Sequence, residues 1–349
     1  MTIEVPTITV IIPMYNAAKY IEQAVDSALN QTFKDIEVLI INDGSTDGSY
    51  ELVRACYGDN PRVRLIDNRK NMGSALTRNT GIRSATGKYV ALLDADDVYL
   101  PTMLETLYAT AEHHQSDVVS SIGYLLSNGE NISQNFSEQF RAVSECTPSQ
   151  DAIAPPDNFH ERVEAYLRGE FGFCVCWNKL YRRKFLLDNN IFYPRTVEDR
   201  GFVLKCVLCA EKFVKVPKFF NIYRNGIQSQ SRKPPTLERL SQSVKTMAGF
   251  VSDLEEIMSD FDFFNDNPVY KYRVIERHLC ALDEAALIGY YLDGRAIDAA
   301  VIKTVGEAAD KIFGDRSQMV AWLFHRYHVF YRQNLELIAR LRQLESQRK

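Results

Sequence analysis

Short apolar segments alternate with segments of helical period through the first hundred residues. Four short β-rich segments are expected to be strands: Ile8–Met14, Ile36–Asn42, Val63–Asp67 and Tyr89–Asp94. The runs Val10–Ile12 and Val38–Ile41 are apolar at consecutive positions, which is typical of parallel strands buried on both faces. Two helical stripes lie between them, one made of Ile21, Ala24, Val25, Ala28 and Leu29, and one made of Leu76, Thr80 and Ile82 in a helix that Gly87 ends. The alternation predicts βαβ units, and therefore an α/β fold with a mostly parallel, Rossmann-like sheet sandwiched by helices.

The pattern changes after about residue 120. The stretch Ser127–Asn158 is rich in Ser, Asn, Gln and Pro, which predicts a loop-like insertion. Two strands and a helix are expected beyond it: Phe171–Tyr181, Phe213–Tyr223 and Glu198–Ala210. After Pro234 the pattern is helical to the end. We therefore expect an α/β domain over residues 1–232 and a C-terminal helical region over residues 233–349.

Composition narrows the function classes. The 349 residues carry 41 basic and 45 acidic side chains, a net charge of −4, so no overall positive field attracts nucleic acid. Seven scattered cysteines indicate a reducing compartment, and the pair Cys206 and Cys209 in an apolar segment is interpreted as buried thiols, not zinc ligands. The sequence shows no secretory signal and no stretch of about 18 apolar residues that could span a membrane. We expect a soluble, cytoplasmic protein.

The fourth predicted strand runs directly into three carboxylates, Asp94, Asp96 and Asp97. Acids crowded at a strand end repel one another unless a cation lies among them, and hard oxygen ligands suit Mg²⁺ or Mn²⁺. An ion held by one or two protein carboxylates keeps positions for phosphate oxygens. The alternative is that these acids only cap a following helix that begins near Pro101.

Two other strand ends carry candidate ligand-binding residues. The first strand runs into Pro13–Asn16, which contains Tyr15, and the second into Asn42–Gly48, which contains Asp43. Ligands of parallel α/β sheets bind beyond the carboxyl ends of the strands. A tyrosine face, a carboxylate that accepts a bond from an imide N–H and a metal-binding acid together describe a site for a uridine diphosphate. Taken one at a time, the same residues are ordinary turn and cap residues.

The order and spacing of these motifs resemble those of family 2 glycosyltransferases with the GT-A fold. The matching segments are Pro13–Asn16, Asn42–Gly48, Asn71–Ile82, Gly87–Tyr89 and Leu93–Asp97. The resemblance is close over residues 6–120 and looser as far as Arg224. It implies transfer of a sugar from a nucleotide diphosphate with inversion at the anomeric carbon. It also implies a donor-binding half at residues 1–120 and an acceptor and catalytic half at residues 121–232.

The resemblance assigns a nucleotide-sugar site made of Pro13, Tyr15, Asp43, Arg78, Asp94, Ala95, Asp96 and Arg224. Within it, Tyr15 matches the position that packs on the base and Asp43 the position that bonds the base edge. Arg78 matches a residue that approaches the nucleotide, and Asp94 matches the acid that faces the ribose and the sugar. Asp96 matches the ligand of the Mn²⁺ or Mg²⁺ cofactor.

The leaving diphosphate needs a positive partner as its charge develops. Arg224 or Arg232 is the candidate, together with the metal ion. Many relatives carry a further metal-binding histidine after the Tyr-Arg pair, where this chain has Asn225–Gln228. We expect weaker metal binding, or another group that completes the set of ligands.

Asp199, at the start of a predicted helix, matches the family's catalytic base, which takes the proton of the acceptor hydroxyl. A carboxylate can do so where apolar walls raise its pKa. The candidates for such a wall are Phe171, Phe173, Trp177 and Phe202. Glu198 and Trp177 are the candidate acceptor-binding residues. Two alternatives stay open: Asp199 and Glu198 only complement a helix dipole, and Trp177 is a core residue.

Residues 319–342 form an aromatic, basic segment of helical pattern. One hypothesis is that it docks as a peripheral helix on the cytoplasmic face of the inner membrane. The other is that it packs on its own domain or on a second copy in a homodimer.

The sequence thus predicts an inverting, metal-dependent glycosyltransferase. It would move a hexose or N-acetylhexosamine from a UDP-sugar to a glycan or lipid-linked glycan acceptor in exopolysaccharide, capsule or lipopolysaccharide biosynthesis. An alternative is a non-catalytic UDP-sugar-binding subunit of a polysaccharide synthase complex, and the presence of Asp199 counts against it. A third is a nucleotidyltransferase, but the first strand lacks the glycine-rich basic loop that holds a triphosphate.

Overall fold

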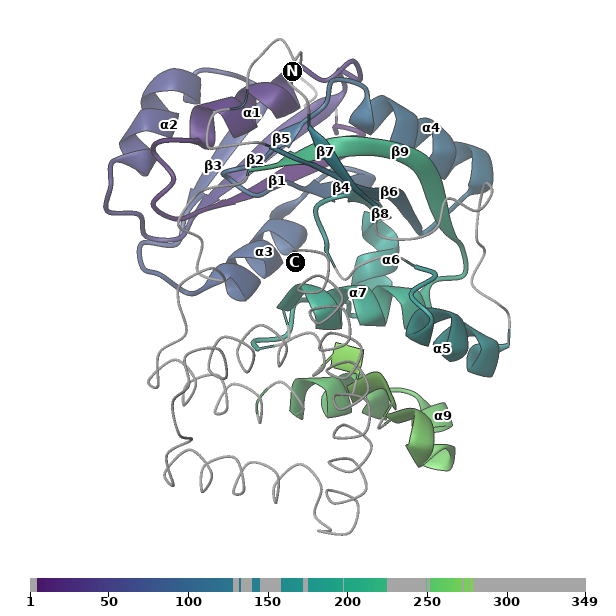
Figure 1. Ribbon diagram of the computed structural model, residues 1–349. Coiled ribbons are helices and arrows are strands. Elements are labelled where there is room, and N and C mark those ends of the chain that lie inside the picture. Colours follow the sequence, from purple (N-terminus) through teal and green to yellow (C-terminus); the bar gives the residue numbers. More distant parts are fainter. Residues whose placement is uncertain are drawn as a thin grey trace, which may run out of the picture. The chain divides into compact units, whose positions relative to one another are not determined.

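The computed structural model describes residues 5–127, 132, 140–144, 158–171, 175–196, 198–224, 249, 252–271, 273–275 and 277–278 (Figure 1). One compact unit contains Met1–Lys233 together with Asp253–Ala281, and the fold below concerns this unit. Residues 253–281, which we expected in the C-terminal helical region, therefore group with the α/β domain. The predictions for Arg232, for Asn225–Gln228 and for the tail at 319–342 lie outside the described residues.

The described strands form one nine-stranded sheet in the order β3-β2-β1-β4-β8-β6-β9-β5, with β7 paired to β6. The strands are β1 (Ile8–Met14), β2 (Ile36–Asn42), β3 (Val63–Asp67), β4 (Tyr89–Leu92), β5 (Val98–Tyr99), β6 (Val118–Leu126), β7 (Arg141–Ser144), β8 (Lys179–Arg182) and β9 (Phe213–Tyr223). Strands β1 to β4 are parallel, as predicted. Strand β8 then pairs antiparallel with both β4 and β6. The carboxyl ends of β1, β2 and β4 consequently share one edge of the sheet.

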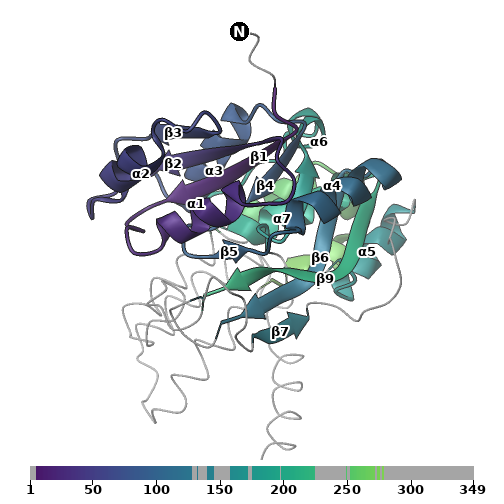
Figure 2. The same cartoon turned by 90° about the horizontal axis from the view of Figure 1, so that it is seen from above.

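Helices cover both faces of this sheet, as the views from the front and from above agree (Figures 1 and 2). One face carries α1 (Ile21–Leu29), α2 (Ser49–Tyr57) and α4 (Met103–His114). The other carries α3 (Ser74–Ser84), α6 (Arg183–Asp188) and α7 (Glu198–Cys209). Helix α5 (Phe159–Leu167) packs against α7, and α9 (Asp262–Asp266) contacts α5 through phenylalanines. The sandwich confirms the predicted fold class.

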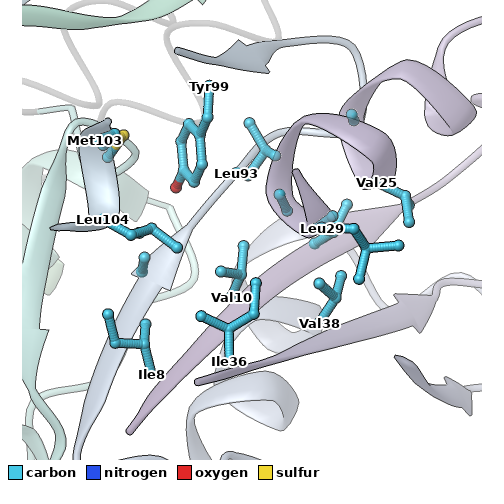
Figure 3. Packing of buried hydrophobic residues seen from close by; sticks show 14 of the residues in the cluster. Ile8, Val10, Val25, Leu29, Ile36, Val38, Leu93, Tyr99, Met103 and Leu104 are labelled. Carbon is cyan, nitrogen blue, oxygen red and sulfur yellow. The ribbon is translucent and has the colours of Figure 1, made fainter. Parts of the chain in front are cut away.

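The main apolar core lies between the sheet and the helices α1 and α4 (Figure 3). Val10 of β1 and Val38 of β2 face Val25 and Leu29 of α1 across this layer. All five residues of the predicted α1 stripe are buried. The prediction is confirmed because this helix buries a purely apolar face, the case that a 3.6-residue period detects.

Helix α3 differs from its prediction. Its buried face includes Thr77, Arg78 and Asn79, whereas Leu76 and Thr80 are only partly buried. The helix also ends at Ser84, before Gly87. Gly81 brings its backbone against the sheet, since a Cβ there would lie 2.4 Å from the Ile11 Cγ2 atom. The polar face is buried because it borders the site described below.

Several other boundaries also change. Strand β4 ends at Leu92 instead of Asp94. Of the predicted strand Phe171–Tyr181, the residues that the structure describes are extended only from Lys179 onward, in β8. Aromatic residues produced that wrong prediction, because Phe171 packs on Phe213 without belonging to a strand. Within the predicted insertion, β7 pairs with β6, and Ile132 is buried against Val98 and Ile222.

Two expectations from composition have structural outcomes. Cys206 is buried and Cys209 partly buried, and both are free thiols, as expected. Among the described residues, no helix combines the length and the apolar character that crossing a membrane requires.

Candidate active site

The acids after β4 form a tight turn in which the Asp97 amide donates to the Asp94 carbonyl over 3.0 Å. Asp97 is 2% exposed, and its Oδ1 accepts a bond from the Arg224 amide at 3.0 Å. Its Oδ2 is buried and has no hydrogen-bond partner among the described residues. Burial, followed by the neighbouring charges of Asp96 and Asp94, raises the pKa of Asp97 above its ordinary value.

Asp96 also lies close to other carboxylates, and its side chain is more accessible to solvent than that of Asp97. Burial, and then the charge of Asp94, raise the pKa of Asp96 to about 6, although Arg224 and Arg78 partly offset the rise. The Arg224 guanidinium donates to the Asp96 carbonyl oxygen at 2.7 Å. The acids are thus held close together at the cost of raised pKa values, and the cation expected among them stays a prediction.

Arg78 joins two of the predicted site residues that are 105 positions apart in the chain. Its Nη2 donates to Asp94 Oδ1 at 2.7 Å, and its Nη1 lies 3.7 Å from Asp199 Oδ1. The guanidinium also lies over the Tyr193 ring, 5.5 Å from the ring centre. Arg78 comes from the buried face of α3, so the polar face of that helix links the turn after β4 to the start of α7.

Asp199 lies in the first turn of α7. Its side chain is 26% exposed, yet Oδ1 is shielded from solvent and lacks a hydrogen-bond partner within the described part of the chain. Burial is the main cause that raises the pKa of Asp199, Asp94 and Glu198 add to it, and Arg78 opposes it. The buried Cys176 thiol lies beside the same carboxylate. A carboxylate with a raised pKa is a stronger base, which is the property that proton abstraction requires.

Tyr15 and Asp43 lie at the carboxyl ends of β1 and β2, respectively. The Tyr15 side chain is 48% exposed, so its ring is free to contact a flat ligand. Asp43 is buried and holds the loop before α3: its Oδ1 accepts from the Met72 amide at 2.9 Å and its Oδ2 from the Gly73 amide at 3.0 Å. Asn68 donates to Oδ1 as well. Each carboxylate oxygen accepts about two bonds, so Oδ2 keeps one acceptor position.

Three further predicted residues border the same edge. Pro13 is the penultimate residue of β1, and Ala95 is a buried residue of the acid turn. Arg224 follows β9 and is buried, with its guanidinium donating to Gln23 at 2.6 Å and lying over the Tyr20 ring. The structure brings Arg224 to the acids as predicted, and a contact with the diphosphate stays a prediction.

The two candidate acceptor residues differ in position. Trp177 is 5% exposed, stacks on Tyr223 and meets Tyr124 edge to face. The structure therefore favours the core alternative for Trp177. Glu198 directly precedes Asp199 and has a φ of +34°, in the left-handed region that non-glycine residues seldom adopt.

Gln23 is a site residue that the sequence reasoning missed. Its Oε1 accepts from Arg224, which has only donors, so its amide nitrogen is oriented to donate to the Ile132 carbonyl at 2.7 Å. One α1 side chain thereby ties the end of β9 and part of the predicted insertion together. No local signal marks it, because both partners lie more than a hundred residues away in the chain.

A comparison with known families shows to which family the chain belongs. The sequence model described as Glycosyl transferase family 2 matches residues 9–188, more than half of the chain. The chain belongs to glycosyl transferase family 2. This transferase is 32% identical over 241 residues to the cholesterol galactosyltransferase of Borreliella burgdorferi, covering 69% of this chain and 66% of that one. It is 30% identical over 252 residues to the glycosyltransferase EpsJ of Bacillus subtilis, covering 70% of each.

Solved structures of other transferases resemble this fold. The structure of S. aureus TarS 1–349 in complex with UDP-GlcNAc aligns with a TM-score of 0.64 and 20% identity, covering 88% of this chain and 81% of that one. The mannosyltransferase PcManGT from Pyrobaculum calidifontis, in complex with GDP-Man and Mn²⁺, aligns with a TM-score of 0.50 and 18% identity, covering 90% and 83%. The fold is GT-A, as predicted.

Proposed function

We propose that this transferase moves a hexose or N-acetylhexosamine from a UDP-sugar to a hydroxyl of a growing surface glycan, with inversion, and that Asp199 is the general base. The observation that carries the proposal is the Asp94–Arg78–Asp199 cluster. It places a shielded carboxylate with a raised pKa beside the acid that the family resemblance assigns to the donor sugar.

The proposed reaction uses these positions. The acceptor oxygen attacks the anomeric carbon from the face opposite the diphosphate, and a C–O bond forms as the bond to the diphosphate oxygen breaks. The acceptor's proton passes to the Asp199 carboxylate, whose pKa burial raises. Arg78 remains within 3.7 Å of Asp199, so it limits how far the pKa of that carboxylate rises and holds its orientation.

Support for a uridine nucleotide comes from two strand ends. The exposed ring of Tyr15 suits stacking on a base, and the remaining acceptor position on Asp43 suits an imide N–H. The TarS complex contains UDP-GlcNAc, which agrees with this choice, although GDP-Man is the donor in the PcManGT structure. The name of the hyaluronan synthase of Pasteurella multocida, 48% identical over 101 residues and covering 29% of this chain and 10% of that one, supports a glycan acceptor. The name of the cholesterol galactosyltransferase of Borreliella burgdorferi gives a sterol instead.

The acid turn fits a divalent cation. Asp97 Oδ2 is buried and lacks a partner among the described residues, and crowding raises the pKa of Asp96. An ion at this turn would be held by few carboxylates together with the phosphates of the substrate. Asp96, supported by Asp97, would hold Mg²⁺ or Mn²⁺, whose charge would stabilise the leaving diphosphate.

The experiment compares Asp199→Asn with the wild-type protein. UDP-sugars are screened for metal-dependent hydrolysis and transfer, and UDP affinity is measured by calorimetry. We expect Asp199→Asn to lose about 10²–10⁴-fold in transfer, the usual contribution of a general base, while its UDP affinity stays within about threefold. Asp188→Asn, which removes an exposed carboxylate at the end of α6, is the matched control.

Two results would contradict the proposal. Near-normal turnover of Asp199→Asn would exclude it as the base, and transfer that persists after chelation of metal would exclude the role of Asp96. A purified chain that binds UDP-sugar but neither hydrolyses nor transfers it would favour a non-catalytic subunit of a synthase complex.

A further inference from the structure

The chain on both sides of Asp199 is held by one segment, whose described residues are 253–271, 273–275 and 277–278. On the N-terminal side, the Thr196 amide donates to Asp253 Oδ2 at 2.7 Å, and the Thr196 hydroxyl donates to the same oxygen. On the C-terminal side, Arg200 Nη1 donates to the His278 carbonyl at 2.8 Å. The base therefore lies between two anchors that come from far along the chain, beyond the end of the family match at residue 188.

The backbone at this point needs such anchors. Glu198, the residue before Asp199, has a φ of +34°. A non-glycine residue in this region costs of order 1 kcal/mol or more, and it persists only where its surroundings hold it. Because the turn is strained, loss of one anchor lets residues 196–199 relax, and the Asp199 carboxylate moves with them.

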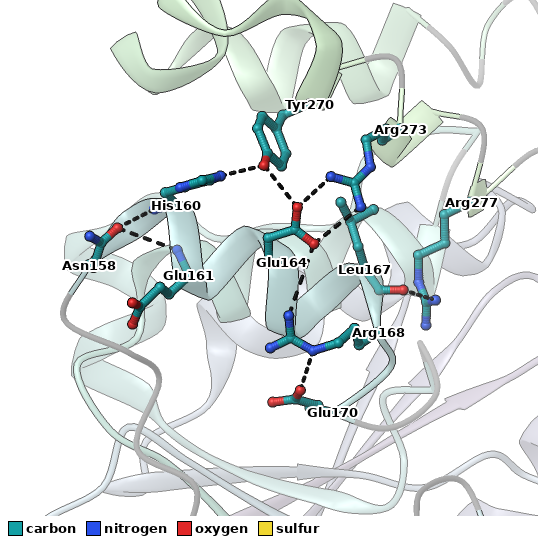
Figure 4. Close-up of polar contacts among 10 residues, drawn as sticks. All are labelled: Asn158, His160, Glu161, Glu164, Leu167, Arg168, Glu170, Tyr270, Arg273 and Arg277. Carbon is teal, nitrogen blue, oxygen red and sulfur yellow. Dashed lines mark hydrogen bonds and ion pairs between the residues drawn. The ribbon is translucent and has the colours of Figure 1, made fainter.

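The segment is held at both ends: Leu254, Ile257 and Met258 near Asp253 are buried, and the part before His278 contacts α5. Tyr270 donates to Glu164 of α5 at 2.8 Å, and Arg273 forms an ion pair with the same carboxylate (Figure 4). Arg277 donates to the Leu167 carbonyl at 2.7 Å. These contacts tie the segment to α5, which packs against α7.

We propose that Asp253 is a positioning residue for the catalytic base: by binding Thr196 it fixes the strained turn that holds Asp199 beside Arg78. The inference rests on the proposed function, because it takes Asp199 as the base. Asp253 does not touch substrate in this proposal, so it acts on turnover through Asp199 and leaves the nucleotide end of the site unchanged.

The test uses the full chain and three variants. Asp253→Ala removes the acceptor oxygen, whereas Asp253→Asn keeps one amide oxygen that can accept both Thr196 bonds. Thr196→Val removes the hydroxyl donor and keeps the backbone donor. The control is Asp260→Asn, which breaks the ion pair of 2.7 Å between Asp260 and Lys205. Asp260 lies on the same segment as Asp253, and Lys205 lies on α7, the helix of Asp199.

We expect Asp253→Ala to lower kcat by about 10- to 100-fold, the effect of a displacement of about 1 Å at a reacting group. UDP affinity and donor KM should stay within about twofold. Asp253→Asn should restore kcat to within a few-fold, Thr196→Val should show a smaller loss, and Asp260→Asn should match the wild type.

Three results would overturn the inference. The first is an unchanged kcat in Asp253→Ala, and the second is a loss of UDP affinity and thermal stability in parallel with turnover, since the segment would then merely support the fold. The third is equal losses in the Ala and Asn variants. If Asp253→Ala does not fold, an unchanged kcat in Thr196→Val overturns it. Asp199→Asn, assayed in parallel, separates this failure from a failure of the proposed function.

Discussion

Replacing Asp96 by Asn should make the metal-free protein more stable, although it should abolish sugar transfer. The reason is that the folded protein holds this carboxylate where its ionised form is disfavoured: burial and the charge of Asp94 raise the pKa of Asp96 from 3.8 to about 6. The unfolded chain ionises first as pH rises. Asp96 therefore costs stability progressively between pH 3.8 and about 6, and the full cost is present above that range.

The magnitude follows from the same values. The difference between 3.8 and about 6 is about 2 pH units, and at about 1.4 kcal/mol for each unit the cost at pH 8 is about 3 kcal/mol. Asp96 is only partly buried, so water screens part of its repulsion from Asp94, and we expect a cost of about 2 kcal/mol. A domain of about 250 residues then gains about 4–8 °C in Tm. Below about pH 4 the gain should vanish.

The assay is thermal unfolding of wild type, Asp96→Asn and the surface control Asp188→Asn, in EDTA at pH 4, 6 and 8. A second series adds Mn²⁺ and UDP. Ligands that bind only the folded state raise Tm, so the wild type should gain stability in this series and Asp96→Asn should gain much less.

Two outcomes would refute the reasoning. If Asp96→Asn melts at or below the wild-type Tm at pH 8 in EDTA, the carboxylate is not under the electrostatic cost that its position indicates. If the difference stays the same from pH 8 to pH 4, its cause is packing and not ionisation.

Two further changes test how the site is supported. Gly81→Ala should destabilise the domain by about 1–2 kcal/mol in urea unfolding, because the new Cβ would meet Ile11 Cγ2 at 2.4 Å and overpacking outweighs the better helix propensity; an unchanged midpoint would show that α3 can withdraw from the sheet. Gln23→Met, which removes the bonds to Arg224 and Ile132, should lower the free energy of unfolding by about 1–3 kcal/mol, and Gln23→Glu, which keeps an acceptor for Arg224, by less. Equal losses in the Met and Glu variants would assign the whole effect to the bond between Gln23 and the Ile132 carbonyl.

Strands β1 and β2 could be predicted closely from the sequence because burial on both faces leaves mostly apolar side chains, whereas β3 was recognised although it is only partly buried. The bounds of β1, β2 and β3 agree with their predictions. The buried face of helix α3 could not be predicted in the same way. It carries Arg78 and Asn79, and a hydropathy pattern assigns such polar residues to the solvent-exposed face of a helix. Burial of polar groups depends on partners from distant segments, and a local pattern contains no information about them.

The same division applies to the site. The motifs predicted that Asp94, Asp96 and Asp199 would gather, and the structure brings Asp94 and Asp199 to one arginine. Arg78 was expected to approach the nucleotide, and that contact stays a prediction. The contacts observed for Arg78 are those with Asp94 and Asp199. Gln23 was missed because its partners lie more than a hundred residues away, and Trp177 was placed with the acceptor because an aromatic side chain near a strand suits either role.

Strand β4 is parallel to β1 on one side and antiparallel to β8 on the other, and the acid turn leaves the sheet at this seam. The two flanks are joined across this seam, because Arg78 of α3 lies beside Asp199 and Arg224 donates to the Asp96 carbonyl. Under the proposed function, the donor contacts would come from the side with β1, β2 and β3, and the base from beyond β6. A change of acceptor would then have to leave these two arginines in place, since both flanks depend on them.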